Sequence, residues 1–194
     1  MNAGGADNSR GKLRYVPVMP GLRDVLCERP ELLLVGINPG LRSGALGHHF
    51  AGRGNPFWRL LFAAGLTPRL LSFEDDRSLA DLGVALTNLC PRTTRSADEL
   101  TAEELARGRR TLIRKCRLLQ PRVVGLVGIT VYTAVFGARA GGGPGPKPER
   151  LGGAPVFVVP NPSGLNASYP GFEQKLVWYR KLRRFVQASA AAAG

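Results

Sequence analysis

Three asparagines stand directly after apolar runs of the sequence, and their side chains could bind a neutral polar ligand. Asn38 lies in a GINPG motif, Asn88 in a TNL segment, and Asn161 opens an NPSG motif, with no Asp or Glu at any of these points. A carboxamide offers both a donor and an acceptor, which suits a ligand with C=O and N–H edges such as a nucleobase. Each asparagine alone is also typical of a turn. The three together predict a ligand crevice, provided that the fold brings them to one place.

Apolar runs of alternating type would position these asparagines. The aliphatic run 32–37 is typical of a buried parallel strand. The pattern predicts further strands over 84–86, 123–127 and 156–159, helices over 55–65, 101–120, 129–136 and 173–186, and a loop over 141–153. Strands that alternate with helices imply βαβ crossovers and a mostly parallel sheet covered on both faces. In such an α/β fold, ligands bind beyond the carboxyl ends of the strands, where the asparagines lie.

The length of 194 residues predicts one compact domain, over residues 13–186. We expect residues 1–12 to be a flexible arm and residues 187–194 to be a disordered tail. The last helix, over 173–186, is predicted to turn four side chains inward, namely Leu176, Tyr179, Leu182 and Val186.

The net charge of +13 favours a polyanionic partner, either nucleic acid or a membrane surface. It argues against ligands that would bind to an acidic patch on this protein. A solvated basic coat on an ordinary enzyme is the alternative. Three scattered cysteines exclude a disulfide framework and a four-thiolate iron–sulfur cluster, and they suggest a reducing compartment. Without a secretory signal or a spanning apolar stretch, we expect a soluble, cytoplasmic protein.

Other nucleotide and metal motifs do not fit the sequence. Neither G-x-G-x-x-G nor the P-loop pattern is present. The only histidines are His48 and His49, which are more typical of polar surface than of a metal site, and a zinc site would need carboxylates that the pattern does not place. Phe50 follows them; its ring could either stack on a base beside the crevice or plug the start of the next helix.

Taken together, these motifs resemble the mismatch-specific uracil/thymine DNA glycosylase family. The likeness runs from about residue 32 to 186, with GINPG as the first motif and NPSGL as the second. Phe50, the GNPFW segment at 54–58, and TNL ahead of Arg92-Thr93-Thr94 stand between them in the expected order. GHH followed by an aromatic residue is similar to the eukaryotic thymine-removing branch, whereas NPSGL is closer to the bacterial uracil-removing branch.

The resemblance implies a three-layer α/β/α sandwich that acts on duplex DNA, with no metal or cofactor. We also expect a monomer. It implies that Asn38 positions the water that attacks the sugar C1′. Base-binding roles fall on Ile37, Phe50, Asn88 and Asn161, with the Phe50 ring stacked on the flipped pyrimidine. The wedge that fills the gap and contacts the opposite guanine would be formed by Ser163, Gly164, Leu165 and Asn166. Family members often carry Arg near the end of that loop, whereas this chain has Ala167.

This chemistry can proceed without the two carboxylates of ordinary glycosidases. A pyrimidine leaves as an anion whose charge spreads onto its ring oxygens, and backbone N–H groups can stabilise that anion as in an oxyanion hole. Asn38 cannot remove a proton near neutral pH, so it can only hold water in line, and we expect a slow enzyme selective for good leaving groups. Four loop arginines are the candidates for phosphate contacts: Arg42, Arg53, Arg92 and Arg95.

Other functions remain open on the sequence alone. A non-catalytic nucleic-acid-binding module could use the same crevice to sense flipped bases. A hydrolase with Ser163 as nucleophile would need a nearby His, and the G-x-S-x-G elbow is absent. The basic helix 173–186 could contact a membrane surface, although its apolar positions fit a core better. Uracil opposite guanine is the expected substrate, with thymine or etheno-cytosine as the other candidates.

Overall fold

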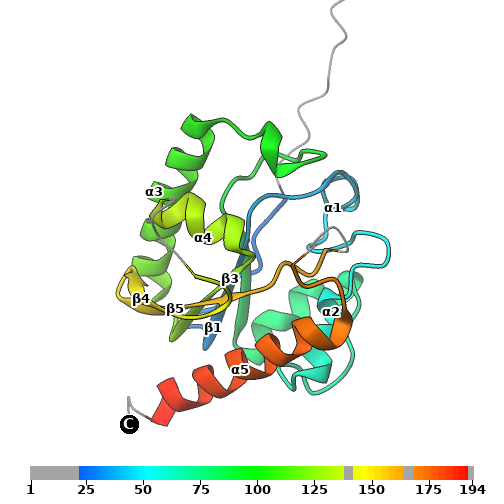
Figure 1. Cartoon of the computed structure of the whole chain (residues 1–194), viewed down its shortest axis with the longest axis vertical. Helices are drawn as coiled ribbons and strands as arrows, with labels where there is room; N and C mark the ends of the chain where they lie inside the picture. The colour runs from blue at the N-terminus through cyan, green and yellow to red at the C-terminus, as the bar shows by residue number, and fades with distance from the viewer. Residues whose placement is uncertain (1–21, 138–141, 164–167, 192–194) are drawn as a thin grey trace, which may run out of the picture.

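The computed structural model describes residues 22–137, 142–163 and 168–191, which form a single five-stranded sheet with helices on both faces (Figure 1). The strand order is β2-β1-β3-β5-β4. The strands are β1 (Leu32–Gly36), β2 (Val84–Asn88), β3 (Val123–Val127), β4 (Gly145–Leu151) and β5 (Ala154–Val159). All neighbouring pairs are parallel except β4 with β5, which confirms the predicted mostly parallel α/β sheet.

Five α-helices and two 3₁₀ helices complete the described part of the chain. They are α1 (Leu41–Leu46), α2 (Phe57–Ala63), α3 (Ala102–Leu119), α4 (Ile129–Phe136), α5 (Phe172–Ala191), η1 (Phe73–Leu82) and η2 (Ala97–Glu99). Capping boxes start α3 at Thr101, as the sequence indicated, and η1 at Ser72. No described helix is long and apolar enough to cross a membrane.

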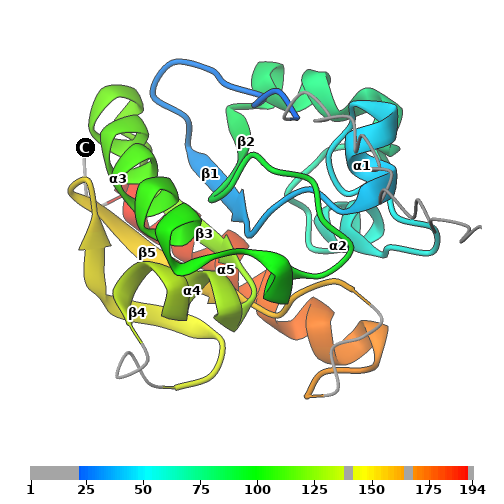
Figure 2. The same cartoon turned by 90° about the horizontal axis from the view of Figure 1, so that it is seen from above.

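Two apolar cores, one on each face of the sheet, make the protein a three-layer sandwich. Alternate residues of β1 serve opposite faces: Leu32 and Leu34 join the core under α2 and α5, while Leu33 and Val35 join the core under α3 and α4. Seen from above, α3 and α2 lie on opposite sides of the strands and α5 passes behind them (Figure 2). The four inward residues predicted for the last helix are all buried.

The segment 141–153, predicted to be a loop, contains the edge strand β4, so that prediction was wrong over Gly145–Leu151. Prolines at 146 and 148 argued against a strand, but an edge strand tolerates proline because one side of it needs no ladder hydrogen bonds. Gly152 and Gly153, both with positive φ (61° and 96°), form the tight turn from β4 into β5. The Gly-Gly pair was the signal for this hairpin.

The C-terminal helix is longer than the sequence pattern indicated. Residues 187–191, expected to belong to a disordered tail, form the last turns of α5, which ends at Ala191. This part of the sequence is rich in Ala, the residue with the highest helix propensity, which explains why the helix extends further. Residues 192–194 and the predicted arm 1–12 lie outside the described residues.

Candidate active site

A pocket of about 680 Å³ opens at the carboxyl ends of β1, β2, β3 and β5. It brings together the three predicted asparagines, Asn38, Asn88 and Asn161, with Ile37 and Phe50. Its volume is in the range of small-molecule sites. Among the described residues that line it there is no Asp or Glu, and the only Lys or Arg is Arg95. Apart from Arg95 and the imidazole of His49, the described pocket walls are built of carboxamides, hydroxyls, peptide groups and apolar side chains.

The side chain of Asn38 is held in one orientation by three acceptors. Its Nδ2 donates to the Thr94 hydroxyl at 2.6 Å and to the carbonyls of Arg92 and Pro39 at 3.0 and 3.2 Å. A flipped amide would set its oxygen against two carbonyl oxygens, which cannot donate. Oδ1 is thus the free end, with no hydrogen bond to any described residue. It offers an acceptor at the pocket wall that can hold the hydrogen of a water molecule.

Thr94 belongs to the Arg92-Thr93-Thr94 segment of the resemblance, but the sequence analysis gave it no role. The Thr94 hydroxyl accepts from Asn38 and donates to the Ser96 carbonyl at 2.7 Å, so its two roles are compatible. The Thr94 N–H donates to the Pro39 carbonyl at 3.1 Å, which joins the GINPG segment to the loop after β2. Thr94 is only 3% exposed. The GINPG motif therefore depends on a residue 56 positions away in the sequence.

Phe50 lines the pocket and packs against the start of α2, which confirms the plug at the helix start, whereas stacking of its ring on a base stays a prediction. Its ring stacks on Phe57 with centroids 3.6 Å apart and planes at 17°. Its backbone has a φ of 51°, in the left-handed region. The N–H groups of Phe50 and Ile37 make no backbone hydrogen bond to described residues. Both residues line the pocket.

Gly36 allows Asn88 and Phe50 to approach each other at the end of β1. A Cβ at position 36 would lie 2.5 Å from Asn88 Oδ1 and 3.6 Å from Phe50 Cζ. The first contact is shorter than real side chains allow. A side chain at position 36 would therefore displace the carboxamide of Asn88 from the pocket floor.

Asn161 stabilises the turn after β5. Its Oδ1 accepts from the Ser163 N–H at 2.9 Å, which is an Asx turn. At the end of the neighbouring strand β3, a Cβ on Gly128 would lie 3.3 Å from Asn161 Cβ. Gly164, Leu165, Asn166 and Ala167 lie outside the described residues, so of the predicted wedge only Ser163 is placed.

His48 and His49 flank a buried carboxylate. Asp76, 2% exposed, accepts from the His49 N–H at 2.9 Å and lies 3.1 Å from His48 Nδ1. His49 is 1% exposed, so the expectation of polar surface was wrong for it. Its Nε2 faces the Arg23 carbonyl at 3.0 Å, and burial lowers the pKa of His49. No described group of three or more His, Cys, Asp or Glu is arranged to hold a metal ion.

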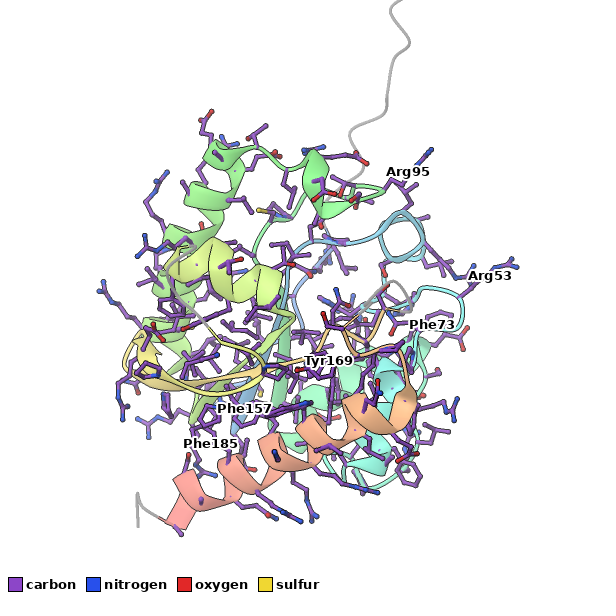
Figure 3. All side chains as sticks on the ribbon, viewed as in Figure 1. Arg53, Phe73, Arg95, Phe157, Tyr169 and Phe185 are labelled. Atoms are coloured by element: carbon purple, nitrogen blue, oxygen red, sulfur yellow. The ribbon has the colours of Figure 1, made fainter. Side chains whose placement is uncertain are left out.

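The four predicted phosphate-contacting arginines differ in their surroundings. Arg92 makes a bidentate pair with Glu104 at 2.6 and 2.9 Å and donates to the Glu99 carbonyl, while Arg42 donates to the Ala51 carbonyl at 2.7 Å. The pair with Arg92 lowers the pKa of Glu104 to about 2. Arg53 and Arg95 instead point outward at the same end of the molecule (Figure 3).

The comparisons with known proteins agree with this architecture. Residues 23–183 match the family model of the uracil DNA glycosylase superfamily, so the chain belongs to that superfamily. The fold is similar to a solution NMR structure from Methanosarcina acetivorans described as a "putative Uracil DNA glycosylase". The TM-score is 0.58 at 19% sequence identity, and the match covers 85% of this chain and 98% of the other. Family membership supports a DNA glycosylase, a hydrolase of N-glycosidic bonds in DNA.

Proposed function

We propose that this protein removes uracil mispaired with guanine from duplex DNA, hydrolysing the N-glycosidic bond to leave an abasic site. Asn38 would hold the attacking water through Oδ1, in line with the sugar C1′. The observation that carries this proposal is the orientation of the Asn38 amide, whose Nδ2 is fully used by Thr94, Arg92 and Pro39. An acceptor orients water but does not take its proton at neutral pH, so catalysis depends on an easily departing base.

The pocket offers that base several complementary contacts. In the proposal, the N–H groups of Ile37 and Phe50 stabilise the negative charge that develops on the pyrimidine oxygens. The carboxamides of Asn88 and Asn161 meet the polar edges of the base, and the Phe50 ring covers one of its faces.

Flipping the nucleotide out of the duplex costs a few kcal/mol, and the cost is least at a mismatch. This favours uracil opposite guanine as substrate. We propose that the wedge and the contacts to the opposite base are formed by Ser163, Gly164, Leu165 and Asn166. An apolar wedge offsets part of the free energy needed to unstack the base. Arg53 and Arg95 are the proposed phosphate contacts, because their side chains project from the end of the molecule that carries the pocket.

The test compares the parent protein with Asn38→Ala on four DNA substrates under single-turnover conditions in chelator. The substrates carry U·G, U·A, T·G or single-stranded uracil, and alkali-labile sites report excision. We expect excision from U·G by the parent and a loss of about 100-fold or more in Asn38→Ala, with unchanged DNA affinity.

Asn55→Ala is the matched control, because Asn55 also lines the pocket but its Oδ1 accepts from the Phe57 N–H at the start of α2. It should retain excision within a few-fold, once its stability is checked. Full excision by Asn38→Ala would contradict the role of Asn38. DNA binding by the parent without excision of any base would indicate the non-catalytic module instead.

A further inference from the structure

Helix α5 buries two polar side chains against the segment that follows β5. Lys175 Nζ donates to the Ser163 carbonyl at 3.2 Å, and the Tyr179 hydroxyl donates to the Pro160 carbonyl at 3.4 Å. The two side chains are four positions apart, so they lie on the same face of the helix, one turn from each other. Lys175 is 2% exposed and Tyr179 is 0% exposed. Helix α5 therefore holds the segment 160–163 by a backbone carbonyl at each end of that segment.

Lys175 is unusual because its ammonium group is buried without a carboxylate. Among the described residues it is the only Lys or Arg that is buried, and none of the ion pairs in that part of the chain includes it. Burial lowers its pKa because the charged form loses its hydration. One hydrogen bond to a neutral carbonyl does not offset such a cost. An apolar side chain of similar length would suit the stability of this site better.

The segment that these two side chains hold carries part of the pocket wall. Pro160, Asn161 and Ser163 all line the pocket. The Asx turn between Asn161 Oδ1 and the Ser163 N–H lies between the two fixed carbonyls. A shift of this segment would therefore move the carboxamide of Asn161 relative to Asn38, which stands on a different strand end.

We propose that Lys175 and Tyr179 are positioning residues for base excision, which fix the segment 160–163 and with it Asn161 in the pocket. This inference rests on the proposed function. Neither side chain is placed in contact with the substrate. The cost of burying Lys175 is on this account a loss of stability that is retained because it fixes the geometry of the site.

The test measures excision and stability of the same variants. Lys175→Met removes the ammonium but keeps an unbranched side chain, and Tyr179→Phe removes only the hydroxyl. We expect Lys175→Met to lower the single-turnover rate on U·G DNA by about 10- to 100-fold, while its melting temperature stays unchanged or rises. Tyr179→Phe should show a smaller loss of rate. Lys181→Met, at an exposed lysine of the same helix whose Nζ lies over Trp178, is the matched control and should keep the parent rate.

A lower excision rate together with an unchanged or higher melting temperature in Lys175→Met would indicate a positioning role. A parent-like rate in Lys175→Met overturns the inference and leaves the proposed function intact. A rate that falls only together with the melting temperature also overturns it, because a purely structural role predicts that coupling. A parent protein that releases uracil from none of the four substrates would instead contradict the proposed function, and the inference with it.

Discussion

At the scale of single residues, the orientation of one amide decides what the pocket can do. Asn38 Nδ2 is bonded to Thr94 and to two carbonyls, so the end of the side chain that remains for a ligand is an acceptor. An acceptor can fix a water molecule by its hydrogen and leave a lone pair directed at the sugar. Thr94 is the one side chain in this arrangement that can be altered without touching Asn38 itself.

Thr94→Val should lower excision by about tenfold, because it removes one of the hydrogen bonds that orient Asn38. DNA affinity should stay at the parent value, since Thr94 is buried. Single-turnover assays and binding titrations measure the two effects separately.

Thr93→Val is the control at the neighbouring position. The Thr93 hydroxyl is buried without a hydrogen-bond partner among the described residues, so its loss should cost no activity. Equal losses of rate in the two variants would show that the loop as a whole, rather than the bond to Asn38, is responsible.

At the scale of elements, the sequence predicted the helices and strands that follow regular patterns, but it did not predict elements that break those patterns. The strand over 123–127 and the helix over 129–136 were predicted to the residue. The strand β4 was missed because its prolines are compatible only with a strand at the edge of the sheet, and the sequence alone did not show that β4 is an edge strand. The contacts of Asn38 with Thr94, and of Lys175 with Ser163, join segments distant in the sequence, so no local pattern could reveal them.

The loop after β2 is tied to the start of α3 by Arg92 and Glu104. Their bond lowers the pKa of Glu104 from 4.5 to about 2, so the folded state favours the carboxylate. Its contribution to stability is full above about pH 4.5 and is lost as the pH falls toward 2. Glu104→Gln should therefore lower the melting temperature at neutral pH, and the difference from the parent should shrink through that window.

Gln still permits the capping box at Thr101, so this variant isolates the charge. Glu103→Gln is its control, because the Glu103 side chain is 81% exposed and lies 3.8 Å from Arg107. Melting curves at several pH values measure both. A difference between parent and Glu104→Gln that did not change with pH would contradict the assignment.

At the scale of the whole molecule, the net charge of +13 should make the affinity for DNA depend strongly on salt concentration. The logarithm of the affinity should fall linearly with the logarithm of the salt concentration, because each phosphate contact releases condensed counterions. Arg53→Gln and Arg95→Gln should each reduce that slope by about one.

Arg184→Gln provides the comparison for these variants. Arg184 is exposed on the C-terminal half of α5. That half of the helix lies on the opposite side of the molecule from the labelled Arg53 and Arg95 (Figures 1 and 3). Loss of Arg184 should leave the salt slope unchanged. Equal slopes in all variants would argue that Arg53 and Arg95 do not contact phosphates.

In the mechanism proposed above, the pocket cleaves an N-glycosidic bond with an oriented water and no titrating base. The most direct measurement is the pH dependence of single-turnover excision at saturating protein. Because no titrating group acts at the sugar in the proposed mechanism, we expect a rate that changes by less than about twofold between pH 6 and 8. A rate that falls about tenfold per pH unit on acidification would reveal an ionised base at the sugar and would contradict the claim.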